Sequence, residues 1–406
     1  MSKINDVFYG SSAPSHRATL LTSTSTHKTS QEPQYLRWQT GDLAHSIRWQ
    51  SQAGWVPPKK IIEIDDTLSA DRAYRLASEG NGLVWRGDFQ HAKQLLQALK
   101  RRLNQRPAIA ADLPLPERFH RIRLARAQAA RTLGQIIIVV EPGYHLRLKR
   151  TPDIEAACEV AYDQRDHAFA VPLTELMGVL SAYQWQTQGV WVEPLKAHIY
   201  PRHGVFAPTR QEYLNLLDQA FLPKHCHTAF DIGTGTGVVA ALLAKKGVER
   251  IVATDVNPSA LVCAEFNMQN LGLGRQVSVM AADLFPNGRA DLVVCNPPWL
   301  PGKVNTPLDA AIYDPDSAML KAFIQGVGDH LNPNGQAWLI LSDLAEHLQL
   351  RSRETLLGWF EAAGLHIIAQ HAVKPSHPKT QQIDDPLHFE RNKEVTSLWQ
   401  LSVEKA

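Results

Sequence analysis

In the second half of the chain, short apolar runs alternate with longer segments in which apolar residues recur at helical spacing. The strands that this pattern predicts are 229–232, 250–254, 277–281, 290–295, 336–342, 365–371 and 395–403. The helices predicted between them are 238–246, 258–271, 318–330 and 353–363. Strands and helices that alternate at such short spacing indicate a doubly wound, mainly parallel sheet.

The first half has a mixed α/β pattern with weaker signals. A short strand is expected at 82–85, and Asp88 is placed to cap a helix that runs from 89 to about 102. A second helix is expected over about 117–132, followed by a strand at 135–140. A turn at Glu141-Pro142-Gly143 predicts a further strand that continues to Leu148. These signals suggest a disordered tail over 1–33, an N-terminal α/β substrate-recognition domain over 34–195 and a catalytic domain over 196–406.

Charge is distributed unevenly along the 406 residues. The net charge is only +2, but residues 101–150 contain 11 Lys and Arg against 3 Asp and Glu. The second half, from residue 201, is acidic, with 17 basic and 21 acidic residues. A basic stretch of this kind is either a phosphate-binding patch or a solvated helix face.

Composition excludes several classes of protein. The hydrophobic fraction of 44% is typical of a globular chain, and no apolar run is long enough to span a bilayer. The four cysteines are scattered and form no CxxC pair, so we expect a cytoplasmic protein with reduced thiols. The triplet His225-Cys226-His227 has no second cluster of ligands, so no metal site is predicted.

A glycine-rich segment, Asp231-Ile232-Gly233-Thr234-Gly235-Thr236-Gly237, links the strand 229–232 to the following helix. Glycines at this point allow a sharp turn and a close approach of a ligand to the backbone. A dinucleotide site would need G-x-G-x-x-G, but position 238 is valine. The G-x-G-x-G spacing with a preceding acid favours S-adenosylmethionine, which has no pyrophosphate.

Two further acids follow the next strands in order. Asp255 ends the strand 250–254 and can accept hydrogen bonds from the two ribose hydroxyls. Asp283 follows the strand 277–281 and can accept one from the adenine amino group. With their neighbours they complete the expected cofactor site, whose members are Asp231, Gly233, Thr234, Gly235, Gly237, Asp255, Val256, Asp283, Leu284 and Asn296.

The segment Asn296-Pro297-Pro298-Trp299 follows the strand 290–295. Two prolines fix the backbone, so the Asn296 side-chain carbonyl and the Pro297 backbone carbonyl can point at one place. Two such acceptors can hold an NH2 group and orient its lone pair toward the methyl sulfonium, while Trp299 offers a flat face for a planar amide or base. Catalysis would then consist mainly of positioning and desolvation. We therefore expect Asn296, Pro297, Pro298 and Trp299 to be the catalytic residues.

These motifs make the region from about 200 to 345 resemble the class I methyltransferase small domain family. That resemblance implies a Rossmann-like fold, S-adenosylmethionine as the methyl donor and transfer to a planar nitrogen. The family includes glutamine-N5 methyltransferases of release factors and of a ribosomal protein, and ribosomal-RNA guanine-N2 and adenine-N6 methyltransferases. The stretch from Gly204 to Arg210 resembles the family's segment over cofactor and substrate, with Phe206, Pro208 and Thr209 as the implied contacts. Trp299 departs from the more usual Tyr or Phe.

Three functions remain open from the sequence. The first is an N-methyltransferase that modifies a glutamine in a protein of the translation machinery, and the acidic catalytic half favours it. The second is a methyltransferase of an exocyclic amine in ribosomal or other RNA, which the basic stretch 101–150 favours. The third is a non-catalytic protein that binds S-adenosylmethionine. Asp231, Asp255 and Asn296 argue against the third. The oligomeric state is not predicted.

Overall fold

The computed structural model describes residues 32–51, 54–105, 109–110, 112–162, 165–375 and 385–403. The tail expected over 1–33 therefore lies almost wholly outside the described residues. Within the described ranges, no helix combines the length and the apolar character that a membrane crossing needs.

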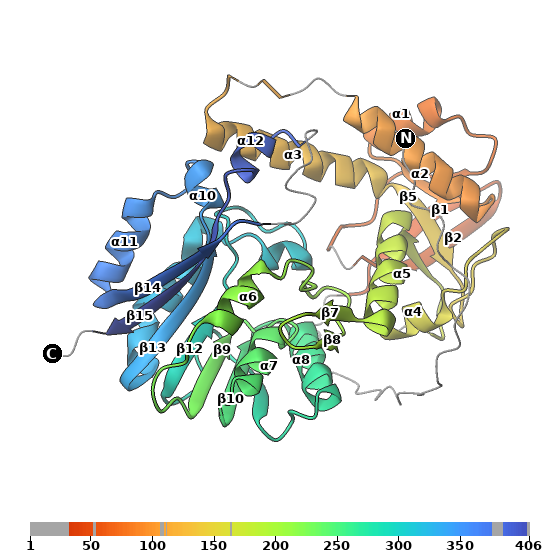
Figure 1. Ribbon diagram of the computed structural model, residues 1–406. Helices are drawn as coiled ribbons and strands as arrows, with labels where there is room; N and C mark the ends of the chain where they lie inside the picture. Colours follow the sequence, from red (N-terminus) through yellow and green to blue (C-terminus); the bar gives the residue numbers. More distant parts are fainter. Residues whose placement is uncertain are drawn as a thin grey trace. The chain divides into compact units, whose positions relative to one another are not determined.

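The first half is built on a six-stranded mixed sheet with the order β1-β2-β6-β5-β4-β3 (Figure 1). Its strands are β1 (Tyr35–Thr40), β2 (Leu43–Trp49), β3 (Ile61–Ile64), β4 (Gly82–Trp85), β5 (Ile136–Val140) and β6 (Phe169–Pro172). β3, β4 and β5 are parallel neighbours, whereas β6 runs antiparallel to β5. The predicted mixed α/β character is therefore confirmed, although β1, β2, β3 and β6 were not foreseen.

Helices of the first half pack on this sheet through a core that includes Trp85, Phe89, Leu99 and Ile138. They are α1 (Ala70–Ser78), α2 (Phe89–Asn104), α3 (Leu115–Leu133), α4 (Glu155–Ala161) and α5 (Leu173–Gln188). A short hairpin of β7 (Val190–Val192) and β8 (Ala197–Ile199) follows.

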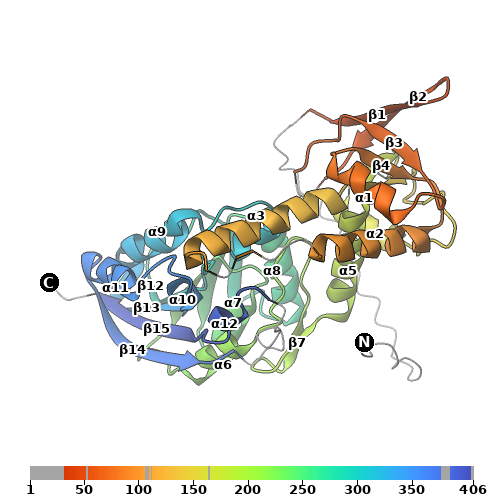
Figure 2. The ribbon, with the colours of Figure 1, turned by 90° about the horizontal axis from the view of Figure 1, so that it is seen from above.

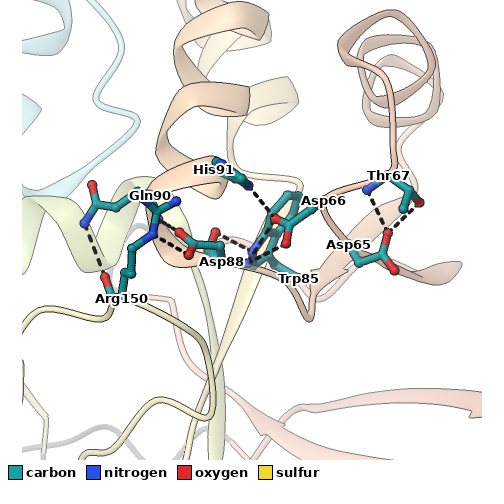
Figure 3. A network of polar contacts seen from close by, with 8 residues as sticks. All are labelled: Asp65, Asp66, Thr67, Trp85, Asp88, Gln90, His91 and Arg150. Carbon is teal, nitrogen blue, oxygen red and sulfur yellow. Dashed lines mark hydrogen bonds and ion pairs between the residues drawn. The ribbon is translucent and has the colours of Figure 1, made fainter.

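Asp88 caps α2 as predicted, because its carboxylate accepts a hydrogen bond from the Gln90 amide at 2.8 Å. Figure 3 shows the polar network around Asp88, in which the Arg150 guanidinium binds the Asp88 carboxylate. In the same network the Asp66 carboxylate accepts a hydrogen bond from the Asp88 amide and contacts the Nδ1 of the His91 ring. The strand expected to continue to Leu148 is wrong. Residues 141–148 form a turn closed by a single bridge between Glu141 and His145, and Tyr144 adopts a positive φ of 60° that interrupts an extended strand.

The second half contains a seven-stranded sheet with the order β11-β10-β9-β12-β13-β15-β14. Its strands are β9 (Thr228–Ile232), β10 (Arg250–Asp255), β11 (Val277–Ala281), β12 (Ala290–Cys295), β13 (Leu331–Ser342), β14 (Leu365–Val373) and β15 (Thr396–Val403). The first five are parallel, and β15 runs antiparallel to both β13 and β14. The predicted doubly wound, mainly parallel sheet is confirmed.

Both faces of this sheet are covered. On one face α6 (Glu212–Gln219) and α7 (Val238–Lys245) pack on Ala229, Leu292 and Val294. On the other, α9 (Ala318–Gly326) and α11 (Arg353–Ala362) pack on Phe230, Val293 and Cys295. This alternation follows from the two-residue period of a strand. The remaining elements are α8 (Pro258–Asn270), α10 (Leu344–His347), α12 (His388–Arg391) and the 3₁₀ turns Pro307–Ala311, Pro315–Ser317 and Val327–His330.

Helix α3 belongs to the first half in sequence but packs against residues of the second half. Phe119 and Ile122 are buried in one apolar cluster with Leu300, Leu344 and Leu387. Figure 2 shows the length of α3 along this part of the molecule. The predicted domain boundary at 195/196 stays a prediction, and this cluster crosses it.

Candidate functional site

The glycine-rich segment forms a turn between β9 and α7. Gly233, Gly235 and Gly237 all adopt positive φ values, of 69°, 56° and 81°. Glycine adopts this left-handed region without the steric cost that a Cβ brings. At Gly237, which precedes α7, a Cβ would in addition lie 2.9 Å from the end of the Met268 side chain. The turn therefore needs glycine for the reason that the sequence suggested.

Asp231 is the last but one residue of β9, and its side chain is buried. Its Oδ2 accepts hydrogen bonds from the Thr234 hydroxyl at 2.6 Å and from the Ala240 amide at 3.0 Å. Burial raises the pKa of Asp231 to about 6, although both hydrogen bonds act in the opposite direction. A carboxylate held in this way can stabilise a cationic group of a ligand in the cavity described below.

Asp255, at the end of β10, is tied to the same turn. Its Oδ2 accepts a hydrogen bond from the Gly235 amide at 3.0 Å, and its Oδ1 accepts one from the Asn257 amide at 2.9 Å. Burial raises the pKa of this carboxyl, while the backbone amides of Asn257 and Gly235 lower it. Asn257 in turn caps α8 by accepting a hydrogen bond from the Ser259 amide at 3.0 Å. The glycine turn and the acid of the neighbouring strand are thus locked together.

A cavity of about 360 Å³ lies at these strand ends. This volume is in the range of small-molecule sites. Its wall contains most of the residues that the sequence predicted as cofactor-binding, namely Asp231, Gly233, Thr234, Gly235, Asp255, Val256, Asp283, Leu284 and Asn296. Phe206, predicted to be close to the substrate, and Pro298 also line it. The sequence pattern therefore brought together residues from four strand ends that do share one cavity.

Five of the predicted site residues lie outside the wall of this cavity, and one of them is Trp299, which is half-buried in the turn after β12. Gly237 shapes the start of α7, and Pro297 is buried in the turn after β12. Pro208 is buried and Thr209 exposed in the segment before α6. Their contact with cofactor or substrate stays a prediction.

Sequence reasoning missed several residues of the cavity wall, among them Tyr213, Ala310, Ala311 and Met319. Met319 reaches the wall at the start of α9, where Asp314 accepts hydrogen bonds from the amides of Met319 and Leu320 at 3.0 Å each. Such residues follow no local motif, because only the folded chain brings their segments to the strand ends.

The turn Asn296–Trp299 borders the cavity directly after β12. The Trp299 indole N–H donates a hydrogen bond to the Asn296 Oδ1 at 2.9 Å. Among the described residues, neither the Asn296 Nδ2 nor the Pro297 carbonyl has a hydrogen-bond partner. Of these two groups only the Pro297 carbonyl is an acceptor, so this carbonyl and the second lone pair of the Asn296 Oδ1 remain for the N–H groups of a planar NH2.

A loop between Leu300 and Tyr313 covers part of the site and is held by α3. The Arg123 guanidinium lies 3.6 Å from the centre of the Tyr313 ring and donates to the Lys303 carbonyl. Leu300 and Asp314 pair across the base of the loop, with the Asp314 amide 2.9 Å from the Leu300 carbonyl. Since Ala310 and Ala311 belong to this loop, α3 supports part of the cavity wall.

Comparison with known proteins agrees with this geometry. Residues 196–363 match the methyltransferase small domain family. This part of the chain is an S-adenosylmethionine-dependent methyltransferase domain. The predicted family, fold class and cofactor are therefore confirmed.

The names of three relatives of the methyltransferase domain specify two kinds of target, glutamine in a protein and adenine in a tRNA. A putative protein N5-glutamine methyltransferase of Methanocaldococcus jannaschii is 27% identical over 41% of this chain and 86% of its own. The release factor glutamine methyltransferase of Mycolicibacterium smegmatis is 33% identical over 41% of this chain and 57% of its own. A tRNA1(Val) (adenine(37)-N6)-methyltransferase of Cytophaga hutchinsonii is 32% identical over 29% of this chain and 52% of its own. The chain thus spans only about half the length of the last two relatives.

In the described ranges, no three His, Cys, Asp or Glu side chains are grouped as metal ligands would be. The polar groups at the site include backbone amides, carboxylates, the amide side chain of Asn296 and the Trp299 indole. This set of groups fits S-adenosylmethionine, whose amino, ribose and adenine groups need acceptors.

Proposed function

We propose that this protein methylates a planar amide nitrogen, with a glutamine side chain in a protein of the translation machinery as the target. The turn Asn296–Trp299 carries this proposal, because its Asn296 side chain and Pro298 line the cofactor cavity. The Asn296 and Pro297 oxygens would accept the two N–H groups of the target amide. Such positioning places the nitrogen beside the methyl group, which S-adenosylmethionine supplies when bound.

The surroundings of the basic stretch support a protein target over RNA. Seven of its arginines lie within 4 Å of a carboxylate, and they are Arg102, Arg118, Arg121, Arg123, Arg126, Arg147 and Arg150. Phosphate binding by these side chains would compete with ion pairs inside the protein. The names of the archaeal and mycobacterial relatives point to glutamine as well.

RNA base methylation is the second candidate. It is favoured by the relative named as a tRNA adenine-N6 methyltransferase, since an exocyclic amine is also a planar nitrogen that Asn296 and Pro297 could hold. The same turn would serve either acceptor, and the target macromolecule distinguishes the two functions.

Transfer of tritiated methyl groups from S-adenosylmethionine into a cell lysate tests the proposal. We expect label that survives ribonuclease and disappears with protease, and that is recovered as N5-methylglutamine after complete enzymatic digestion of the protein. Label that survives protease and disappears with ribonuclease would instead establish the RNA function.

Asn296→Ala tests the site itself. The variant should lose at least a hundredfold in turnover while its affinity for S-adenosylhomocysteine falls far less, because the lost group mainly positions the acceptor. Asn270→Ala, at the exposed end of α8, is the matched control and should behave as the wild type. Full turnover by Asn296→Ala would remove the argument for an NH2 target.

A further inference from the structure

Behind the turn Asn296–Trp299 lies a charged cluster that the sequence did not reveal. The Arg210 guanidinium carbon is 5.3 Å from the centre of the Trp299 ring. The Arg210 Nε donates to the Glu212 Oε1 at 2.7 Å, and its Nη2 donates to the Glu394 Oε1 at 3.2 Å. The side chains of Glu212 and Glu394 are only 6% and 2% exposed, so both carboxylates are buried against Arg210.

The cluster joins four segments that are distant in sequence. Arg210 precedes α6, Glu212 begins it, and Glu394 lies just before β15. The Glu394 Oε1 also accepts a hydrogen bond from the Ser342 hydroxyl at 2.8 Å, at the end of β13. Trp299 adds the turn after β12. Each segment comes from the strand-end edge of the sheet where the cofactor cavity lies.

Buried ion pairs contribute little net stability, because desolvation offsets most of their attraction. Their geometry, however, is well defined, and a guanidinium stacks on an aromatic face where an ammonium would not lie flat. Trp299 is therefore held from two sides. Its ring lies beside Arg210, and its N–H is bound to the Asn296 Oδ1.

This arrangement has a direct effect on Asn296. Because the indole N–H occupies one acceptor position of Oδ1, the amide group of Asn296 is fixed in one orientation. The indole N–H of Trp299 supplies this hydrogen bond. The ring lies beside Arg210 and also packs against the apolar clusters on both faces of the sheet, which fixes its position further.

We propose that Arg210 is a positioning residue for methyl transfer, which acts on the acceptor nitrogen through Trp299 and Asn296. Glu212 and Glu394 hold its guanidinium in place. The inference rests on the proposed function, in which Asn296 binds the acceptor, and it applies to a protein or an RNA acceptor alike. Arg210 itself contacts neither cofactor nor acceptor in this scheme.

Steady-state methyl transfer by the full chain tests the inference, with the methyl-accepting fraction of lysate titrated as the substrate. Arg210→Met removes the guanidinium, and Arg210→Lys keeps the positive charge that both buried carboxylates need for folding. Trp299→Phe keeps the ring and removes the N–H. We expect kcat to fall about tenfold to a hundredfold in each. The apparent KM for the acceptor and the affinity for S-adenosylhomocysteine should stay within about threefold.

Arg289→Met, at an exposed position before β12, is the control and should keep wild-type kcat. The inference fails if Arg210→Lys and Trp299→Phe fold, bind S-adenosylhomocysteine and keep kcat within twofold of wild type. It also fails if their losses lie entirely in cofactor affinity. Asn296→Ala in the same assay separates the two ideas, because its loss of turnover supports the proposed function whatever the Arg210 variants do.

Discussion

At the scale of single residues, Asp231 combines a structural and a chemical role. Its carboxyl holds the glycine turn through Thr234 and Ala240, and its burial raises its pKa to about 6. Thr234 and Ala240 donate to the same oxygen, and no described residue is shown to donate to the other. The second oxygen is therefore suited to the amino group of the cofactor, which is positively charged near neutral pH.

The affinity for S-adenosylmethionine should accordingly depend on the ionisation of Asp231. Below pH 6 the carboxyl is increasingly protonated, so affinity should fall by up to about tenfold per pH unit and level off above pH 7. Calorimetric titration between pH 5 and pH 8 measures this. Asp231→Asn should bind weakly with little pH dependence. An affinity of the wild type that is constant from pH 5 to pH 8 would contradict the assignment.

The raised pKa of Asp231 also determines whether the stability of the cofactor-free protein rises or falls with pH. The folded protein binds this proton more tightly than the unfolded chain, whose Asp has a pKa near 3.8. Below about pH 4 the protonated Asp231 carboxyl therefore makes its full contribution to the free energy of unfolding. This contribution is lost as the pH rises through 6, by about 3 kcal/mol in total. Urea unfolding of wild type and Asp231→Asn at pH 4.5 and pH 7 should show Asp231→Asn gaining relative stability at the higher pH. An equal difference in the free energy of unfolding between the two proteins at both pH values would show that burial does not raise the pKa of Asp231.

At the scale of elements, the segment 331–335 shows what periodicity alone can miss. The strand is predicted over 336–342, so Asn332-Pro333-Asn334-Gly335 would precede it. In the structure β13 begins at Leu331, and its pairing with β12 shifts register between Ala290 and Leu292. Asn334 adopts a positive φ of 65° there, so the strand accommodates the turn residues as an irregularity.

Gly335 is needed at this irregularity. A Cβ there would lie 2.9 Å from the Asn332 carbonyl oxygen and 3.1 Å from that of Ala290, and backbone atoms cannot move aside cheaply. Gly335→Ala should lower the free energy of unfolding by about 1–3 kcal/mol. Gly358→Ala is the matched control, since Gly358 lies in α11 with open space around its Cα and alanine should raise stability by about 0.5–1 kcal/mol. Unfolding in urea measures the free energy of unfolding of both variants. Equal changes in the two would contradict the steric conflict inferred for a Cβ at position 335.

Elements of the second half were largely predictable because each carries its own signal. The strands 277–281 and 290–295 were placed to the residue, and the helices of the second half that were predicted were placed to within a few residues, with the last turn of 318–330 forming the 3₁₀ turn after α9. In the first half, β1 and β2 have many polar residues and β3 and β6 have only four residues each, so local pattern was insufficient. The predicted residues that line the cavity could be found because they follow strand ends in sequence, whereas Tyr213 and Arg210 depend on segments that meet only in the fold.

At the scale of the whole molecule, part of the basic stretch has a further role that the sequence did not suggest. The basic stretch 101–150 was interpreted as a phosphate patch or a solvated face. In the structure Arg118 of α3 binds Glu390 of α12 at 2.6 Å, with side chains only 14% and 9% exposed. Arg126 approaches Asp385 at 3.5 Å. Some of the excess basic residues of the first half thus form ion pairs with acidic residues of the second half.

The pair of Arg118 and Glu390 should matter for stability, because removing one partner leaves a buried charge. Arg118→Met should lower the free energy of unfolding by about 2–3 kcal/mol, and Glu390→Gln should recover part of this in the double variant. Arg121→Met is the control on the same helix. Its partner Glu117 is exposed, so the change should stay below about 0.5 kcal/mol. Additive effects of the two substitutions at 118 and 390 would show that the pair does not interact.

Arg123 links α3 to the loop whose Ala310 and Ala311 border the cofactor cavity. A macromolecule that bound against α3 and displaced it would therefore alter the energy of cofactor binding. Coupling of this kind is thermodynamically reciprocal, so the cofactor would change the affinity for that macromolecule by the same factor. The enzyme would then form the ternary complex with cofactor and macromolecule more readily than either binary complex. Helix α3, which lies outside the catalytic sheet, would transmit this coupling between the two binding events.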